Sequence, residues 1–313
     1  MIDEIKHECG IALIRLKKPY QYYIDKYGTP MYGLNKLYLL MEKQHNRGQD
    51  GAGVAVVKLN VPQGTRYISR YRSVESAPIS DIFKRVNKKF KKVIKSNPKK
   101  YNDAEWMLRN TAFTGEVMLG HLRYGTHGSL GTEYCHPFLR QNNWRTRNLV
   151  MAGNFNMTNV DELFKKLVML GQHPKDKADT VTVMEKIGHF LEDEVAVTYK
   201  SAKAEGLNKE DASNYIADNL NVQRILKRSS KNWDGGYAMA GLLGHGDAFV
   251  LRDPAGIRPA FWYKDDEVVV VASERPVIQT AFNVPIDEIT EIPRGKALII
   301  KKNGETSSYV KGL

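Results

Sequence analysis

The chain has 313 residues, 42% hydrophobic and 26% charged, a globular composition that excludes wholesale disorder. No uncharged apolar stretch reaches about 18 residues, which excludes an ordinary transmembrane helix, and the first ten residues lack the apolar core of a secretory signal. The two cysteines, Cys9 and Cys135, are too few for a disulfide framework, so we expect a cytoplasmic protein.

The net charge of +12 is concentrated in one segment. Residues 84–109 contain ten Lys and Arg against two acids and carry +8 of the excess. Apolar residues recur there at helical steps, which predicts an amphipathic helix with one buried face and one solvated basic face. A phosphate or nucleic-acid patch is the alternative, but the aromatic residues fit the buried face better, so we expect no nucleic-acid partner.

The secondary-structure pattern mixes strands and helices. Apolar, β-branched runs predict strands over 9–16, 53–59, 118–123 and 149–152, and a meander of five strands from Gly236 onward with a hairpin turn at 264–266. Helical periodicity predicts helices over 34–45, 81–95, 159–170, 179–200 and 209–229, the second beginning at Ser80-Asp81 and stopping at Asn97-Pro98. Because regular βαβ alternation is absent, we expect layered antiparallel sheets with helices outside them.

Cys9 is the most informative residue, since it opens an apolar strand and only eight residues precede it. A buried small hydrophobic side chain is the structural alternative. If the first eight residues are removed, Cys9 carries both a thiol and a free α-amine, whose pKa of roughly 7.7–8.0 lets it act as a base near neutral pH. One residue would then supply both nucleophile and general base.

Several motifs, in this order, resemble those of class II glutamine amidotransferases. They are CGI at 9–11, QHNRGQDGAG at 44–53, GHLRYGTHG at 120–128, HPF at 136–138, GNFNMTNVDEL at 153–163, GGYAMAGLL at 235–243, RDPAGIRP at 252–259 and VVASERPVI at 270–278. RGQD and RDPAGIRP are most similar to the amidophosphoribosyltransferase branch of that family. The resemblance implies an α+β fold of the N-terminal nucleophile (Ntn) hydrolase type, a four-layer sandwich of two mainly antiparallel β-sheets between helical layers.

The resemblance also implies an activity and roles for individual residues. Glutamine is hydrolysed to glutamate and ammonia through a thioester on Cys9, and the ammonia is transferred to phosphoribosyl pyrophosphate in purine biosynthesis. Arg47 organises the region of the nucleophile, while the Asn154 side chain and the backbone N–H of Phe155 stabilise the oxyanion. The implied substrate-binding residues are Arg123 for the α-carboxylate of glutamine, Asp179 for its α-ammonium, and Tyr124 and Thr126 in the pocket.

The oxyanion motif departs from the family pattern, which usually reads His-Asn-Gly-Asn. This chain has Gly153-Asn154-Phe155-Asn156. The second donor survives the change from glycine to phenylalanine only if phenylalanine tolerates the local dihedral angles.

Some of these residues also have structural interpretations. Arg123 could form an ion pair, Asp179 could cap a helix N-terminus, and Arg47 could be a charge at a helix C-terminus. Gly48 is expected to supply loop flexibility. In RDPAGIRP, Asp253, Gly256 and Pro259 are expected to form a turn between strands.

We interpret residues 1–8 as a propeptide and 9–313 as one type-2 glutamine amidotransferase domain, with 84–110 and 200–232 as helical elaborations. A phosphoribosyltransferase domain is absent from this sequence, so we expect it on a further domain or chain, in a homo-oligomeric enzyme. We expect no cofactor here, since Mg²⁺ belongs to the transferase domain, and no metal site, since the histidines lack the required spacing. The alternatives are an amidotransferase domain serving another acceptor and a catalytically silent regulatory or basic binding module.

Overall fold

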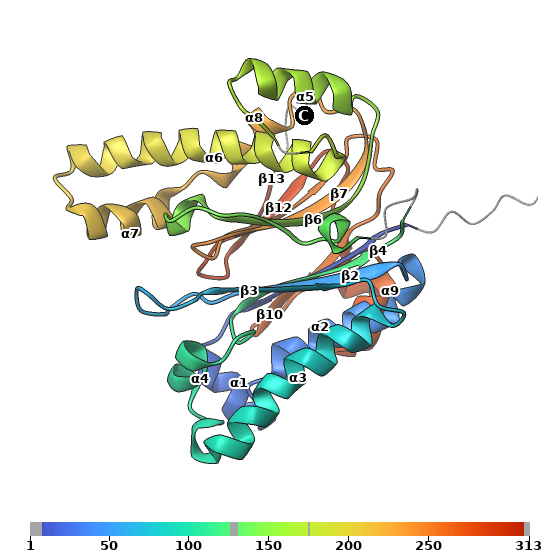
Figure 1. Ribbon diagram of the computed structural model, residues 1–313, viewed down its shortest axis with the longest axis vertical. Helices are drawn as coiled ribbons and strands as arrows, with labels where there is room; N and C mark the ends of the chain where they lie inside the picture. Colours follow the sequence, from blue (N-terminus) through green and yellow to red (C-terminus); the bar gives the residue numbers. More distant parts are fainter. Residues whose placement is uncertain (1–7, 126–130, 175, 310–313) are drawn as a thin grey trace, which may run out of the picture. The chain divides into compact units, whose positions relative to one another are not determined.

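The computed structural model describes residues 8–125, 131–174 and 176–309. The chain divides into two compact units. The first comprises Met1–Pro137, Ala152–Asn154 and Pro259–Ile292, and the second comprises Phe138–Met151, Phe155–Arg258 and Pro293–Leu313. Each unit has its own sheet and its own layer of helices (Figure 1).

The first unit is built on a seven-stranded antiparallel sheet in the order β11-β9-β10-β1-β4-β2-β3. Its strands are β1 (Gly10–Leu16), β2 (Gly51–Val57), β3 (Ile68–Ser73), β4 (Val117–Arg123), β9 (Phe261–Lys264), β10 (Val268–Ala272) and β11 (Thr290–Glu291). Strands β1, β2, β4 and β10 are buried along their whole length, as their apolar runs require. One face packs against α1 (Tyr20–Tyr27), α2 (Tyr32–Lys43), α3 (Pro78–Ser96), α4 (Ala104–Asn110) and α9 (Arg275–Phe282) (Figure 1).

The second unit is built on a six-stranded sheet in the order β13-β12-β8-β7-β6-β5. Its strands are β5 (Phe138–Arg140), β6 (Leu149–Met157), β7 (Gly235–Leu243), β8 (Ala248–Arg252), β12 (Ala297–Ile300) and β13 (Thr306–Tyr309). Helices α5 (Val160–Met169), α6 (Asp179–Ala204), α7 (Lys209–Asn219) and α8 (Val222–Ser229) lie on one side of this sheet (Figure 1). Their apolar residues form a core cluster separate from that of the first unit.

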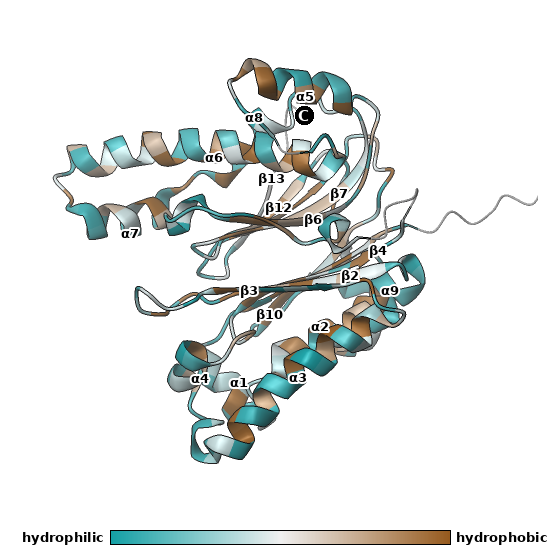
Figure 2. Cartoon of the chain, in the orientation of Figure 1, coloured by the Kyte–Doolittle hydropathy of each residue, from teal (hydrophilic) through white to brown (hydrophobic). Residues whose placement is uncertain are grey.

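Helix α3 confirms the amphipathic segment expected from the charge pattern. Its buried residues are Pro78, Ile79, Ile82, Phe83, Val86, Phe90 and Val93, and both hydropathy colours alternate along it (Figure 2). The expected start at Ser80-Asp81 is wrong, because Pro78 occupies the first turn and Ala77 the cap position. Asp81 instead accepts a hydrogen bond from Ser73 Oγ at 2.8 Å. The expected stop is confirmed, since Asn97 is the C-cap.

Other predicted elements differ from the observed ones in part. The single helix expected over 209–229 is two helices, because the chain breaks at Leu220 and the Asn221 side chain caps α8 by accepting a hydrogen bond from Arg224 N at 2.9 Å. Helices α1, α4 and α9 and strand β3 were not expected, since each is short and its polar residues mask the periodicity. The hairpin turn at 264–266 is confirmed: it joins β9 to β10, and Asp265 Oδ1 accepts hydrogen bonds from the backbone N–H groups of Glu267 and Val268.

The α+β fold with two antiparallel sheets and helical layers is confirmed. Asp253 forms the expected turn in RDPAGIRP, where its carboxylate accepts hydrogen bonds from Ile257 N at 2.9 Å and Arg258 N at 3.0 Å and Gly256 has a φ of 71°. Among the residues that the structure describes, no helix has the length and hydrophobicity needed to cross a membrane.

Candidate active site

Cys9 is half-buried and lies at the start of β1. The pairing of Gly10 with Leu122 places it beside the end of β4. Its Sγ accepts a hydrogen bond from Tyr124 N at 3.4 Å and lies 3.9 Å from Tyr124 O. Burial raises the pKa of the Cys9 thiol, while the contact with Tyr124 and the charges of Arg123 and Arg47 act in the opposite direction. The thiol therefore needs a base to become a nucleophile at neutral pH.

Arg47 ties the nucleophile strand to its surroundings. It ends a short 3₁₀ helix after α2, and its Nε donates to Cys9 O at 3.2 Å. Its two terminal nitrogens donate to Glu8 Oε2 at 2.8 Å and to Glu274 Oε1 at 3.3 Å. The arginine thus fixes the backbone of the nucleophile while both its carboxylate partners compensate its charge.

Gly48 has a different role from the one expected. Its backbone is extended, with a φ of −165°, so it does not use the conformations reserved for glycine. A Cβ at this position would lie 2.5 Å from the backbone carbon of Arg123. The glycine therefore permits close approach to the end of β4, and this contact accounts for the glycine without loop flexibility.

Arg123 is the last residue of β4, and its side chain is buried. The loop that follows is held by Asp50, whose N–H donates to Arg123 O at 3.0 Å and whose Oδ2 accepts a hydrogen bond from Gly125 N at 2.7 Å. Tyr124 lies in this loop and touches Cys9 Sγ. Thr126, also expected in the pocket, lies outside the described residues.

Asn154 reaches the same site from β6. Its side chain is buried, and its Nδ2 donates to Glu8 Oε2 at 3.3 Å. The Glu8 carboxylate thus lies between Asn154 and Arg47. Residues from four distant segments meet here, and we call this group the Cys9 site; its members are Cys9, Arg47, Arg123, Tyr124 and Asn154.

Phe155 and Asp179 belong to the second unit. Within the described residues, the non-glycine residues with positive φ are Phe113, Asn232 and Asn283, so Phe155 sits in strand β6 without the strain that a left-handed conformation would bring. Its ring packs against the core cluster of the second unit. Asp179 is the first residue of α6 and Ala178 is the cap, so the N-cap interpretation is wrong; Asp179 Oδ2 accepts a hydrogen bond from Met157 N at 3.1 Å.

Two buried histidines next to Asn154 were not among the expected site residues. His121 Nε2 lies 3.1 Å from Gly153 O and 3.1 Å from His136 Nδ1, and Gly153 N donates to His136 Nδ1 at 3.3 Å. Burial lowers the pKa of His121 to about 3, and burial together with His121 lowers the pKa of His136. The β5–β6 register, continued by two residues, places His136 opposite Gly153, a relation that the sequence alone does not show.

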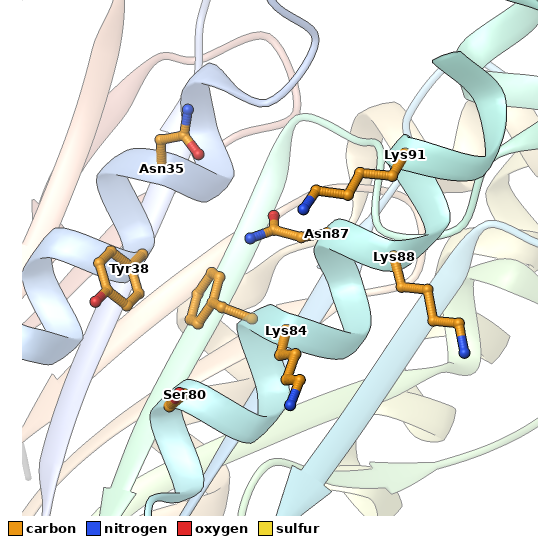
Figure 3. Close-up of a pocket in the computed structure, with 8 residues that line it drawn as sticks. Asn35, Tyr38, Ser80, Lys84, Asn87, Lys88 and Lys91 are labelled. Atoms are coloured by element: carbon orange, nitrogen blue, oxygen red, sulfur yellow. The ribbon is translucent and has the colours of Figure 1, made fainter. Parts of the chain in front are cut away.

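The basic face of α3 borders a groove of about 680 Å³ against α2 (Figure 3). Its lining residues are Asn35, Tyr38, Ser80, Phe83, Lys84, Asn87, Lys88 and Lys91. Asn87 and Lys91 point toward α2, but Lys84 and Lys88 extend away from it (Figure 3). Phe83 is buried against Tyr38, with ring centroids 5.0 Å apart, so it offers no stacking face. The arrangement favours the solvated-face interpretation of the basic helix.

Two solved structures share the fold. One is the glutamine phosphoribosylpyrophosphate amidotransferase of B. subtilis, complexed with ADP and GMP, with a TM-score of 0.53 and 22% identity over 96% of this chain and 49% of that chain. The other is described as the allosteric regulatory enzyme of purine biosynthesis, with a TM-score of 0.56 and 23% identity over 96% of this chain and 48% of that chain. The expected Ntn-hydrolase type of fold is thereby confirmed.

The sequence is similar to curated proteins named amidophosphoribosyltransferase. Those of Methanocaldococcus jannaschii, Escherichia coli and Methanothermobacter thermautotrophicus are 24%, 25% and 26% identical over 88%, 84% and 94% of this chain. The aligned parts are 47%, 42% and 49% of the relatives, so the chain spans about half of their length. No family model matches the chain. The resemblance inferred from the motifs is confirmed, since the chain is similar to amidophosphoribosyltransferases over most of its own length.

Proposed function

We propose that this chain is the glutaminase part of an amidophosphoribosyltransferase. The observation that carries the proposal is the convergence at Cys9. Tyr124 N donates to its thiol, Arg47 donates to its carbonyl, and burial raises the thiol pKa while the charges of Arg123 and Arg47 act to lower it. Asn154 shares a carboxylate partner with Arg47. A thiol at the end of a strand, a cationic surrounding and a buried carboxamide donor are the parts that acyl transfer from an amide requires. The similarity to amidophosphoribosyltransferases supports this assignment.

In the proposed reaction, removal of residues 1–8 frees the α-amine of Cys9. The amine takes the thiol proton as Sγ attacks the side-chain amide carbon of glutamine, and the carbonyl oxygen becomes an oxyanion. Asn154 Nδ2 and the N–H of Phe155 donate hydrogen bonds to that oxyanion. The C–N bond then breaks, ammonia leaves with the proton from the amine, and water hydrolyses the thioester to release glutamate.

The proposed glutamine-binding residues divide the two charges of the substrate. Arg123 pairs with the α-carboxylate through its planar guanidinium, Asp179 pairs with the α-ammonium, and Tyr124 and Thr126 line the pocket. The position of Arg123 beside the nucleophile supports its role. The roles of Asp179, Thr126 and Phe155 rest on the sequence resemblance.

The contacts of Glu8 suggest that the uncleaved chain is inactive for two reasons. The amine of Cys9 is part of a peptide bond, so it cannot act as a base. The Glu8 carboxylate also occupies Asn154 Nδ2 and Arg47, the first of which is the proposed oxyanion donor. Cleavage between Glu8 and Cys9 releases both groups in one step.

The ammonia would pass to a phosphoribosyltransferase domain or chain and react with phosphoribosyl pyrophosphate, in a homo-oligomeric enzyme. Any Mg²⁺ would be bound by that transferase part. A different acceptor is the main alternative within the same family. Ammonia transfer to phosphoribosyl pyrophosphate by the full-length enzyme distinguishes the two, because an enzyme with another acceptor would leave that sugar unreacted.

The decisive experiment is glutamine hydrolysis by protein whose N-terminus has been sequenced. Chains that begin at Cys9 should release ammonia and glutamate in equal amounts, and chains that retain Glu8 should not. Processed protein without turnover, combined with salt-dependent binding of RNA or DNA, would contradict the proposal and favour a basic binding module.

A further inference from the structure

Gly153 is the residue at which the backbone of the proposed oxyanion site has the most conformational freedom. It directly precedes Asn154, and glycine has more backbone freedom than any other residue. The pairing of β5 with β6 ends at Phe138 and Met151. The residue before Phe138 is Pro137, which has no N–H to continue the pairing toward Gly153. On the side of β6 that faces β5, the backbone groups of Gly153 therefore need partners outside the strand pairing.

The two histidines supply both of these partners. Gly153 N can only donate, so His136 Nδ1 must be an unprotonated acceptor and His136 carries its proton on Nε2. Gly153 O can only accept, so His121 Nε2 must be protonated. The single hydrogen on His121 Nε2 and the single lone pair on His136 Nδ1 are both used by Gly153, so the 3.1 Å approach of these two nitrogens adds no separate hydrogen bond. One pair of tautomers satisfies both contacts with Gly153.

These contacts fix the two peptide planes on either side of Gly153. Its N–H belongs to the plane shared with Ala152, and its carbonyl belongs to the plane shared with Asn154. Holding the second plane restricts the direction in which the Asn154 side chain leaves the backbone. Both imidazoles are buried, with 1% of His121 and 8% of His136 exposed, so water does not compete for the bonds.

We propose that His121 and His136 are positioning residues that hold Gly153 and thereby orient the Asn154 carboxamide toward the oxyanion. The proposal rests on the proposed function of Asn154. Neither histidine contacts the reacting atoms, so their loss should lower kcat and leave KM for glutamine nearly unchanged.

The kinetic test uses His136 variants of the processed protein that differ in one hydrogen-bond acceptor. His136→Leu removes the acceptor, and His136→Asn places a carboxamide oxygen near the position of Nδ1. We expect kcat to fall about 10- to 100-fold in His136→Leu, a part of the loss that follows removal of a whole oxyanion donor, and to recover in large part in His136→Asn. In an Asn154→Ala background, His136→Leu should change kcat less than about threefold.

A purely structural role predicts different results. Loss of folded protein would lower kcat by the same factor with Asn154 present or absent, and that outcome would overturn the proposal. His121→Leu and His121→Gln form a second pair, because the glutamine Nε2 retains a donor. The same pattern is expected for that pair if the histidines act through Gly153.

NMR spectroscopy tests the positioning role independently of the proposed function. In ¹⁵N-labelled wild-type protein at pH 7, we expect a proton on Nε2 of both imidazoles, and His136→Leu should shift or broaden the side-chain amide signal of Asn154. Opposite tautomers, or an unchanged Asn154 signal, would overturn the positioning role. Wild-type protein without glutaminase turnover would instead overturn the proposed function, and the amide signal would still decide whether the histidines orient Asn154.

Discussion

The Cys9 site and the groove between α2 and α3 both contain several cations, but the cations are used differently. Arg47 is bound to Glu8, Glu274 and the carbonyl of Cys9. In the basic segment, Arg85, Lys100 and Arg109 form ion pairs with acids three or four residues away. The groove lysines take no part in these pairs within the described part of the chain. A cation held by several partners positions the backbone, whereas a cation in water contributes mainly to solubility.

The largest expected effect tests whether the Cys9 site is catalytic. Replacing Cys9 with Ala removes the thiol that attacks glutamine in the proposed mechanism, so ammonia release from glutamine should fall to the uncatalysed level. Circular dichroism should show that the variant is folded. Glutamine turnover by a folded Cys9→Ala protein would contradict the proposed mechanism.

Asn154→Ala should have the next largest effect. It removes one proposed oxyanion donor, so kcat should fall by about 100- to 1000-fold while KM changes little. Steady-state kinetics on processed protein measures both constants. An increase in KM at constant kcat would mean that Asn154 binds the substrate and does not stabilise the transition state.

Arg47→Ala tests, through the free energy of unfolding, whether the Arg47 contacts stabilise the Cys9 site more than an exposed lysine stabilises α3. The change leaves Glu274 and the Cys9 carbonyl without their donor, so the free energy of unfolding should fall by about 2 kcal/mol. Urea unfolding of the Cys9→Ala/Arg47→Ala protein against Cys9→Ala measures the loss without any effect of turnover. A change below about 0.5 kcal/mol would show that the network contributes no more than a surface ion pair.

The buried histidines make stability depend on pH. Because folding lowers the pKa of His121 to about 3 and also lowers that of His136, the unfolded chain binds more protons below its ordinary histidine pKa of about 6.5. The free energy of unfolding should therefore fall with pH below about 6.5, by up to about 1.4 kcal/mol per pH unit for each histidine. Urea unfolding at pH 7, 6 and 5 measures the slope.

His136→Asn provides the control for that pH dependence. The variant lacks one of the two titrating groups, so its stability should fall less steeply between pH 6 and 5. Identical slopes in the two proteins would show that His136 is protonated in the folded state.

The smallest effect is expected in the α2–α3 groove. Lys88→Ala/Lys91→Ala removes two exposed charges, so stability should change by less than about 0.5 kcal/mol, and glutaminase kinetics should stay the same. Lys89→Ala/Lys92→Ala removes the same charge from the same helix outside the groove and is the matched control. A loss of activity confined to the Lys88 and Lys91 variant would show that the groove has a role that its open geometry does not indicate.

Local patterns were enough to predict the long elements. The apolar stripe of α3 and the Val268–Ala272 strand carry their periodicity in adjacent residues, so each could be found without tertiary information. Short elements such as α1 and α4 could not, since packing against the rest of the first unit stabilises them more than their own sequence does. The predicted N-cap of α3 was wrong for a similar reason. Asp81 accepts a hydrogen bond from Ser73 on β3, a tertiary contact that the local pattern does not show.

By itself, the sequence determined the fold class, the resemblance to amidotransferases and the residue types proposed for the chemistry, because these depend on order and spacing along the chain. Only the tertiary structure placed Arg47 against Cys9, required a glycine at position 48 beside Arg123, and set His121 and His136 around Gly153. Such relations arise when strands pair and loops close, which brings together residues that no local pattern connects. The close backbone approaches and shared hydrogen bonds at the Cys9 site are therefore properties of the folded chain.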